Sequence, residues 1–136
     1  MTTSYCPQCW QAVAGGSAVC EHCRAPLAET GEGYLTKLVA ALSHPDYVTR
    51  RRAAFVLGWL RDGRAREPLL AKLFGSDDPY VRAEAAASLA AIGGPEAEAA
   101  LLRAAADPGQ SVIVRRAAQD ALVRARRRDQ SHACQP

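Results

Sequence analysis

The sequence repeats itself about every 32 residues over most of its length, and this period constrains the fold more than any other feature. The segment TRRRAAFVLGWL, which begins at Thr49, aligns residue for residue with VRAEAAASLAAI from Val81 and with VRRAAQDALVRA from Val114. Apolar residues recur at the same places in all three, as at Ala53, Ala85 and Ala118, and at Leu57, Leu89 and Leu122. A unit of this length that recurs in tandem is typical of stacked repeats.

Each repeat predicts a pair of helices. Ala53, Leu57 and Leu60 fall at i, i+4 and i+7, which places them on one helical stripe. Proline and glycine punctuate the turns between helices. The predicted first helices are 34–43, 65–75 and 95–106, and the second helices are 47–61, 79–92 and 112–127. We expect an all-α fold with repeats at 34–62, 63–94 and 95–128, followed by a polar tail at 129–136.

The second repeat carries the fullest form of the pattern, SDDPYVRAEAAASLAAIG from Ser76. With the spacing L-(x)₆-V-R-x-x-A-x-x-x-L-x-x-I, it resembles the HEAT-like repeats first described in phycobilisome lyases. The resemblance spans about residues 34–127 and implies a short α-solenoid of three HEAT-like helix pairs. It says little about function, because one repeat fold serves many unrelated proteins.

Four of the five cysteines form two CxxC pairs at the N-terminus, with the spacing C-x₂-C-x₁₀-C-x₂-C. Two such turns can aim four thiolates at one point, which suits the tetrahedral shell of a structural Zn²⁺. Four thiolates leave no open position for water, which argues against a catalytic metal. The spacing resembles that of short zinc ribbons over about residues 4–27. We expect a zinc ribbon at 1–28, a linker at 29–33 and the ligands Cys6, Cys9, Cys20 and Cys23.

Other interpretations of these cysteines remain open. They include iron in a rubredoxin-like site, two disulfides, a redox-active CxxC, and replacement of one ligand by His22. In short zinc ribbons glycine often follows the knuckle, whereas Trp10 and Arg24 do so here. Zinc ligation contributes ~10–16 kcal/mol in zinc-finger peptides, and we expect this segment, which is poor in large apolar side chains, to need its metal to fold.

The termini and the charge indicate a cytoplasmic protein with no membrane association. The start, MTTSYCPQC, has neither a basic nor an apolar signal region, and no apolar run approaches a membrane span. The net charge is +3, of which residues 1–33 carry −2 and residues 34–136 carry +5. Four thiolates around one Zn²⁺ add two negative charges, which brings the metal form near +1. This balance lacks the broad positive field of a strong nucleic-acid binder.

Aligned charged residues at the starts of the second helices predict a structural role. Asp46 precedes Arg50 by four residues, and Asp78 precedes Arg82 by four. An aspartate there can cap the helix, and an i, i+4 pair with arginine can support its first turn. The resemblance to HEAT-like repeats implies bonds within and between units. The aligned Arg115 has an uncertain partner.

Two aromatic residues interrupt the repeat. Phe55 and Trp59 occupy positions that hold Ala87 and Ala91 in the second repeat. We expect the ribbon, with Trp10 or Tyr5, to fold over them and so to cover this end of the stack. Two alternatives remain: packing between units, or an exposed anchor for a protein partner. In the last case, contacts would also come from the neighbouring arginines Arg51, Arg52 and Arg116.

The C-terminal end is basic. A polar outer cap for the last repeat is one explanation, and contact with nucleic acid or an acidic protein is another. The residues concerned are Arg124, Arg126, Arg127 and Arg128. His132 and Cys134 lie beyond them in the predicted tail, where a surface metal contact is conceivable.

The sequence favours a non-catalytic adaptor that binds a protein partner. It has no phosphate-binding glycine loop and no paired catalytic carboxylates. HEAT-like hydroxylases of the deoxyhypusine type bind iron through His-Glu pairs, but His22, His44 and His132 are not followed by Glu. Nucleic-acid binding through the basic residues is the alternative, and a lyase-like chaperone or accessory subunit is the third.

Overall fold

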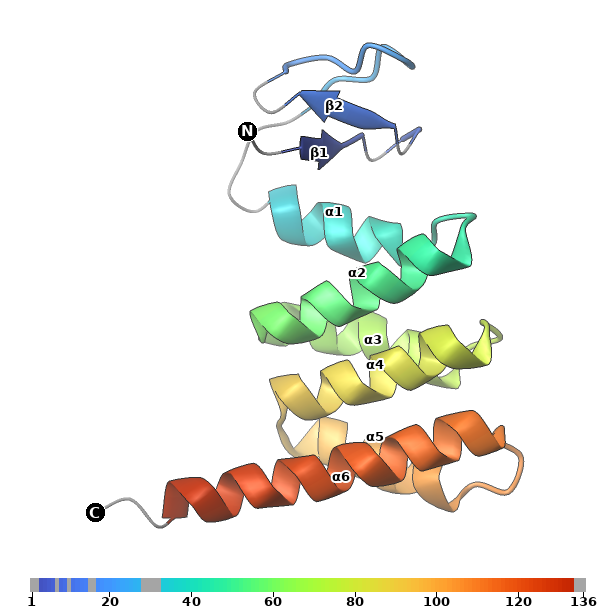
Figure 1. Ribbon diagram of the computed structural model, residues 1–136, viewed down its shortest axis with the longest axis vertical. Coiled ribbons are helices and arrows are strands. Elements are labelled where there is room, and N and C mark those ends of the chain that lie inside the picture. The colour runs from blue at the N-terminus through green and yellow to red at the C-terminus, as the bar shows by residue number, and fades with distance from the viewer. Residues whose placement is uncertain (1–2, 7, 10, 15–16, 28–32, 134–136) are drawn as a thin grey trace.

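The described residues form six α-helices that follow a small N-terminal hairpin, as seen in a computed structural model (Figure 1). The structure describes residues 3–6, 8–9, 11–14, 17–27 and 33–133. The strands are β1 (Thr3–Tyr5) and β2 (Ala12–Ala14), and a 3₁₀ turn, η1, spans Gly63–Ala65. The helices are α1 (Gly33–Ala41), α2 (Tyr47–Leu60), α3 (Arg66–Phe74), α4 (Pro79–Ile92), α5 (Pro95–Ala106) and α6 (Val112–Ala133).

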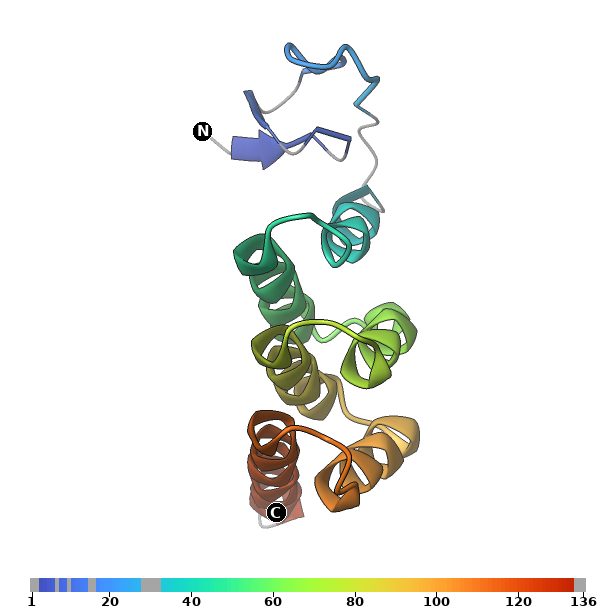
Figure 2. The ribbon, with the colours of Figure 1, turned by 90° about the vertical axis from the view of Figure 1, so that its right-hand side faces the viewer.

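The helices stack as three antiparallel pairs along the long axis of the molecule. In Figure 2, α2, α4 and α6 form one column and α1, α3 and α5 form the other. The all-α repeat fold predicted from the 32-residue period is thereby confirmed. Most helix ends agree with the prediction to within two residues, since proline and glycine mark them.

A single core of leucine and alanine runs through the stack. Leu57, Leu89 and Leu122, which the repeat aligns, all belong to it. Small residues let neighbouring second helices approach closely: Ser88 in α4 donates its hydroxyl to the carbonyl oxygen of Ala54 in α2 at 2.6 Å. Neighbouring repeats are therefore held by apolar burial together with a close approach of their second helices.

The last helix differs from the prediction in length. It continues to Ala133 rather than ending at residue 127, so most of the predicted polar tail is helical. Its end projects beyond the stack (Figure 1). Neither proline nor glycine occurs between residues 128 and 133, so no helix breaker ends the helix there, which explains the extension. The prediction that the last helix ends at residue 127 is wrong.

Asp46 and Asp78 cap their helices as predicted, through bonds to the backbone N–H groups of Thr49 and Tyr80. The expected pairing of Asp46 with Arg50 is wrong. Arg50 donates instead to the carbonyl oxygens of His44 and Pro45 and to Asp77 of the second repeat. Each aspartate accepts a hydrogen bond from the backbone of its own first helical turn. The arginine is then available to bond with the next repeat.

The second repeat uses its arginine in the same way, again without the expected aspartate pair. Arg82 donates to the carbonyl oxygen of Leu73 within the repeat and to the side chain of Gln110 in the third. In the third repeat, the Nε atom of Arg115 is buried and has no hydrogen-bond partner among the described residues. The bonds of Arg50 and Arg82 explain the arginine of the first two repeats, because one guanidinium reaches two turns at once.

Asp77 joins the first two repeats through Arg50 and is also paired with Lys72 of its own repeat. It accepts from Arg50 Nε at 3.1 Å and from Lys72 Nζ at 2.8 Å, beside an open pocket of about 500 Å³. Burial by itself raises the pKa of Asp77, but the hydrogen bonds from Lys72 and the Asp78 N–H, with the charges of Lys72 and Arg50, outweigh it and lower that pKa.

Asp77→Asn is expected to lower the free energy of unfolding by about 1.5 kcal/mol at neutral pH, because two cations lose their charged acceptor. A lowered pKa means that the stabilisation is present above the pKa of the unfolded chain and is lost as the pH falls through the folded-state pKa. Urea melts of both proteins at several pH values should therefore converge in acid. Asp129→Asn, at an exposed side chain near the end of α6, is the control and should change little. A constant difference down to low pH would contradict this account.

Candidate metal centre and candidate binding face

The four cysteines sit on two tight turns of the N-terminal module, which we define as the described part of residues 3–27. The first turn follows β1, which pairs antiparallel with β2, and the backbone N–H of Cys6 donates to the carbonyl of Gln11. In the second turn, the N–H of Cys20 donates to the carbonyl of Ala25, and that of Arg24 to Cys20. Both pairs are thus held by backbone hydrogen bonds.

Arg24 takes the place that glycine often fills in such turns. Its φ is 63°, in the left-handed region that glycine adopts most easily. The turn after the second pair therefore forms without glycine, at some cost in backbone strain. Trp10, which follows the first pair, lies outside the described residues.

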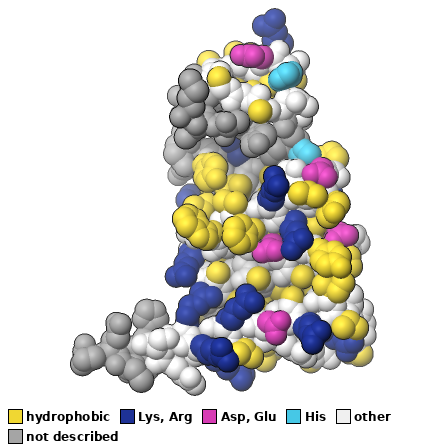
Figure 3. Space-filling view, in the orientation of Figure 1, with side chains coloured by type: hydrophobic (Ala, Val, Ile, Leu, Met, Phe, Trp, Pro, Cys, Tyr) yellow, Lys and Arg dark blue, Asp and Glu magenta, His cyan; other side chains and the backbone are white. Residues whose placement is uncertain are grey.

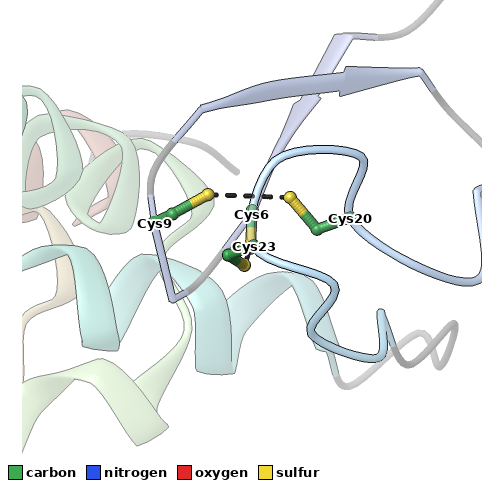
Figure 4. A group of neighbouring side chains, drawn as sticks. All are labelled: Cys6, Cys9, Cys20 and Cys23. Atoms are coloured by element: carbon green, nitrogen blue, oxygen red, sulfur yellow. Dashed lines mark hydrogen bonds between the residues drawn. The ribbon is translucent and has the colours of Figure 1, made fainter.

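The four sulfur atoms converge on one point (Figure 4). Cys6 and Cys23 lie 3.6 Å apart at Sγ, as do Cys9 and Cys20, and all four sulfurs lie within 4.8 Å of one another. A tetrahedral Zn²⁺ with Zn–S bonds of about 2.3 Å needs sulfurs about 3.8 Å apart. The four cysteines can therefore hold a metal ion such as zinc.

The electrostatics of this cluster also fit a cation. Burial raises the pKa of Cys6, but backbone N–H groups of Cys9 and Gln8 and the neighbouring thiols outweigh it and bring that pKa down to about 6. Although the N–H of Gln11 lowers the pKa of Cys9, burial and the other cysteines raise it to about 12. One thiolate forms easily, whereas several together need a positive ion.

The cysteines are free thiols and form no disulfide among the described residues. In the described part of the chain, they are also the one group of three or more metal-ligating side chains that lie close enough for an ion. His22 is exposed and is not part of that group.

The module has its own small core. Cys6, Val13, Cys20 and Leu27 are buried together in a cluster separate from that of the helices. Two of these four side chains are cysteines, so little apolar burial supports the fold. The need for a metal to fold this module stays a prediction, and the small described core is its structural basis.

Phe55 and Trp59 are not covered, so the prediction that the ribbon folds over them is wrong. Their exposed fractions are 57% and 75%. The module lies beyond α1 at the end of the stack, whereas both aromatics project from α2 (Figure 1). The side chains of Trp10 and Tyr5, proposed as the cover, lie outside the described set.

The arginines predicted to accompany these aromatics lie on the same column of helices. Arg51 and Arg52 in α2 and Arg116 in α6 are exposed. Arg51 pairs with Glu84 of α4 at 3.4 Å and lies 5.9 Å from the centre of the Tyr80 ring. In Figure 3, hydrophobic side chains gather over the middle of this face and Lys and Arg side chains below them.

The C-terminal arginines spread around α6. Arg124, Arg126 and Arg127 are exposed, and Arg128 is half-buried. Arg124 aligns with Trp59 and so belongs to the face of the second helices, whereas Arg126 aligns with Arg61 at its edge. Cys134 lies outside the described residues, as does the side chain of His132.

Sequence inspection missed one feature of this face. Val48, Tyr80 and Ile113 align across the three repeats and are exposed by 37%, 52% and 37%. An apolar residue recurs at this position without being part of the core. The repeat alignment contained this signal, but only the burial of each position separates an exposed apolar row from a buried one.

Comparison with known proteins agrees with the fold. A family defined by HEAT repeats matches residues 35–123. The solved structure of human deoxyhypusine hydroxylase in complex with glycerol is similar, with a TM-score of 0.68 and 30% identity over 79% of this chain. The chain spans 36% of the length of that hydroxylase. A search of curated proteins found no match.

None of the described helices is both long enough and apolar enough to cross a membrane. The matched segment covers more than half of the chain and coincides with the six stacked helices. On this evidence, the chain belongs to the family of HEAT repeat proteins.

Proposed function

We propose that this chain is a non-catalytic, cytoplasmic adaptor that binds a protein partner through its second helices and carries a structural zinc ribbon. The observation that carries the proposal is the exposure of Phe55 and Trp59 on a rigid helical face. Large aromatic side chains anchor many protein interfaces, because they bury much area at a small cost in entropy. HEAT repeats commonly serve protein–protein interaction, which fits this use.

The zinc ribbon is proposed from the geometry of the four thiols. Their separations suit tetrahedral coordination by sulfur, and cytoplasmic thiols are kept reduced. Such a shell would be complete without water, so the metal would hold the fold and activate no substrate. We therefore propose a structural zinc ribbon at residues 4–27.

The absence of catalysis is proposed on two grounds. The chain spans 36% of the length of deoxyhypusine hydroxylase, so the activity in that protein's name does not carry over with the similarity. In the present sequence no histidine is followed by Glu, so the iron-binding pattern expected for such hydroxylases has no counterpart. The four thiols leave no site for a substrate on a bound metal.

Replacing Phe55 and Trp59 by serine is expected to abolish capture of the protein partner in a pull-down followed by mass spectrometry. The physical reason is that both side chains are already exposed, so the fold should tolerate the change while the anchor is lost. Tyr34→Ser, at an exposed aromatic residue on α1, is the matched control. Undiminished capture by the double variant would remove this face from the interface.

Nucleic-acid binding is the rival function, favoured by the exposed arginines of α6. The pull-down is therefore paired with a titration of mixed DNA and RNA over a range of salt concentrations. Affinity for phosphate backbones falls steeply with salt, whereas aromatic anchoring does not. Tight, steeply salt-dependent binding would replace the adaptor proposal with this rival.

A further inference from the structure

On the face formed by α2, α4 and α6, aligned positions carry side chains of different size on each helix. The positions of Phe55 and Trp59 in α2 are taken in α4 by Ala87 and Ala91, which are half-buried. With Ala83, these alanines follow one another at intervals of four residues along α4, on one side of the helix. The middle helix, α4, therefore presents a strip of small side chains beside Phe55 and Trp59, which we call the aromatic ridge.

The opposite edge of the strip is charged. The positions in α6 that align with Arg51 and Trp59 hold Arg116 and Arg124, and both are exposed. The acidic residues nearby are Asp120, in the position of Phe55, and Glu84, which is already paired with Arg51. The strip of alanines thus lies between aromatic side chains on α2 and arginines on α6.

The dimensions of the strip suit one helix. Packed helices lie about 8–10 Å apart, which puts α2 and α6 about 16–20 Å from each other. An α-helix with its side chains is about 10–12 Å wide, and small residues allow it to approach closely. A helix lying over α4 would touch Phe55 and Trp59 on one side and Arg116 and Arg124 on the other.

An extended peptide fits this face less well. The backbone groups of α2, α4 and α6 are bonded within their own helices, so the face offers no strand edge for main-chain pairing. A helical ligand satisfies its own backbone and needs only side-chain contacts. Charge complementarity then sets its composition, because the arginines call for carboxylates and the aromatic ridge for apolar side chains.

We infer that the strip of Ala83, Ala87 and Ala91 is the docking site for an acidic amphipathic helix of a partner protein. Its apolar side contacts Phe55 and Trp59, and its carboxylates contact Arg116 and Arg124. The inference rests on the proposed adaptor function and specifies the chemistry of the partner.

A synthetic probe tests this directly on the full chain. The probe is a fluorescent peptide of about 20 residues, long enough to form helix, with leucine on one stripe and glutamate elsewhere. A second peptide keeps the leucines and replaces glutamate by lysine, and a single-stranded RNA is the third probe. Fluorescence anisotropy is expected to show saturable binding of the glutamate peptide and weaker or no binding of the other two.

Ala87→Glu is expected to lower the affinity for the glutamate peptide about tenfold or more, since it places bulk and negative charge under the bound helix. Ala99→Glu, at an exposed alanine of α5, is the matched control and should leave binding unchanged. As Ala87 is half-buried, a second variant, Arg116→Glu with Arg124→Glu, changes only exposed side chains. This variant should bind the lysine peptide more tightly than the glutamate peptide.

Failure to bind the glutamate peptide, equal binding of both peptides, or equal effects of Ala87→Glu and Ala99→Glu would overturn the inference. Preferential binding of RNA would overturn it as well. If the double variant Phe55→Ser with Trp59→Ser still abolishes capture of the natural partner, the adaptor function stands. Only the inference that the partner presents an acidic helix is then wrong. If capture is unaffected, the adaptor face itself is wrong.

Discussion

Removal of zinc by a chelator is expected to unfold the N-terminal module and to leave the melting temperature of the six helices unchanged. The reason lies in the two separate cores. The module buries Val13 and Leu27 with two cysteines, whereas the leucines and alanines of the helices form their own cluster. Metal binding contributes most of the folding free energy in small zinc modules, and among the described residues of this one only Val13 and Leu27 add large apolar side chains to the core.

Two measurements distinguish the parts. Far-ultraviolet circular dichroism follows the melting of the helices, and the amide NMR signals of the module report its own unfolding. Cys6→Ser should reproduce the effect of the chelator, because the buried Cys6 thiol is one of the four proposed ligands. Cys134→Ser is the matched control, since this fifth cysteine lies outside the two CxxC pairs of the sequence.

A fall in the helical melting temperature on zinc removal would show that the module stabilises the solenoid. The N-terminal cysteines would then act as a clasp for the repeats. An unchanged temperature would indicate a separate head joined to the solenoid through residues 28–32. Retention of the module's signals without metal would contradict its dependence on zinc.

Gly58→Ala is expected to destabilise the helical stack by about 3 kcal/mol, because α2 and α4 touch at this residue. A Cβ atom added to Gly58 would lie 2.4 Å from Ser88 Oγ and 2.7 Å from Ser88 Cα. Rotation of the serine side chain cannot relieve the contact with Cα, so the two helices must move apart. The hydroxyl bond from Ser88 to the carbonyl of Ala54 would also be strained.

Thermal melting checks this result, and a loss of this size should lower the melting temperature by at least about 10 °C. Gly63→Ala is the control: its added Cβ would approach no atom closer than 3.9 Å. Because alanine favours helix over glycine, the control should be neutral or slightly stabilising. If Gly58→Ala also melts at or above the original temperature, the close approach of α2 and α4 is not required.

Periodicity was enough to predict the helices. The aligned Leu57, Leu89 and Leu122 are in the core, and prolines mark the starts of α4 and α5. Such signals are local, because they depend on side-chain spacing along one helix and on backbone geometry at its ends. The length of α6 was missed, since no stop signal follows residue 127 and a basic helix can continue without packing.

The pairing of charged side chains could not be predicted from spacing. Asp46 and Arg50 are four residues apart and could have bonded, but Arg50 reaches Asp77 in the next repeat. The choice depends on how far one repeat is rotated against the next, which packing sets. For the same reason, Phe55 and Trp59 were expected under the ribbon but stand exposed.

The sequence by itself determined the repeat unit, the six helices and the four candidate ligands of one metal, because each follows from spacing along the chain. Only the tertiary structure decided that the four sulfurs converge within 4.8 Å, that the aromatics are exposed, and that an alanine strip separates them from the arginines. These features depend on contacts between distant segments, and such contacts are set by the packing of whole elements rather than by any local pattern.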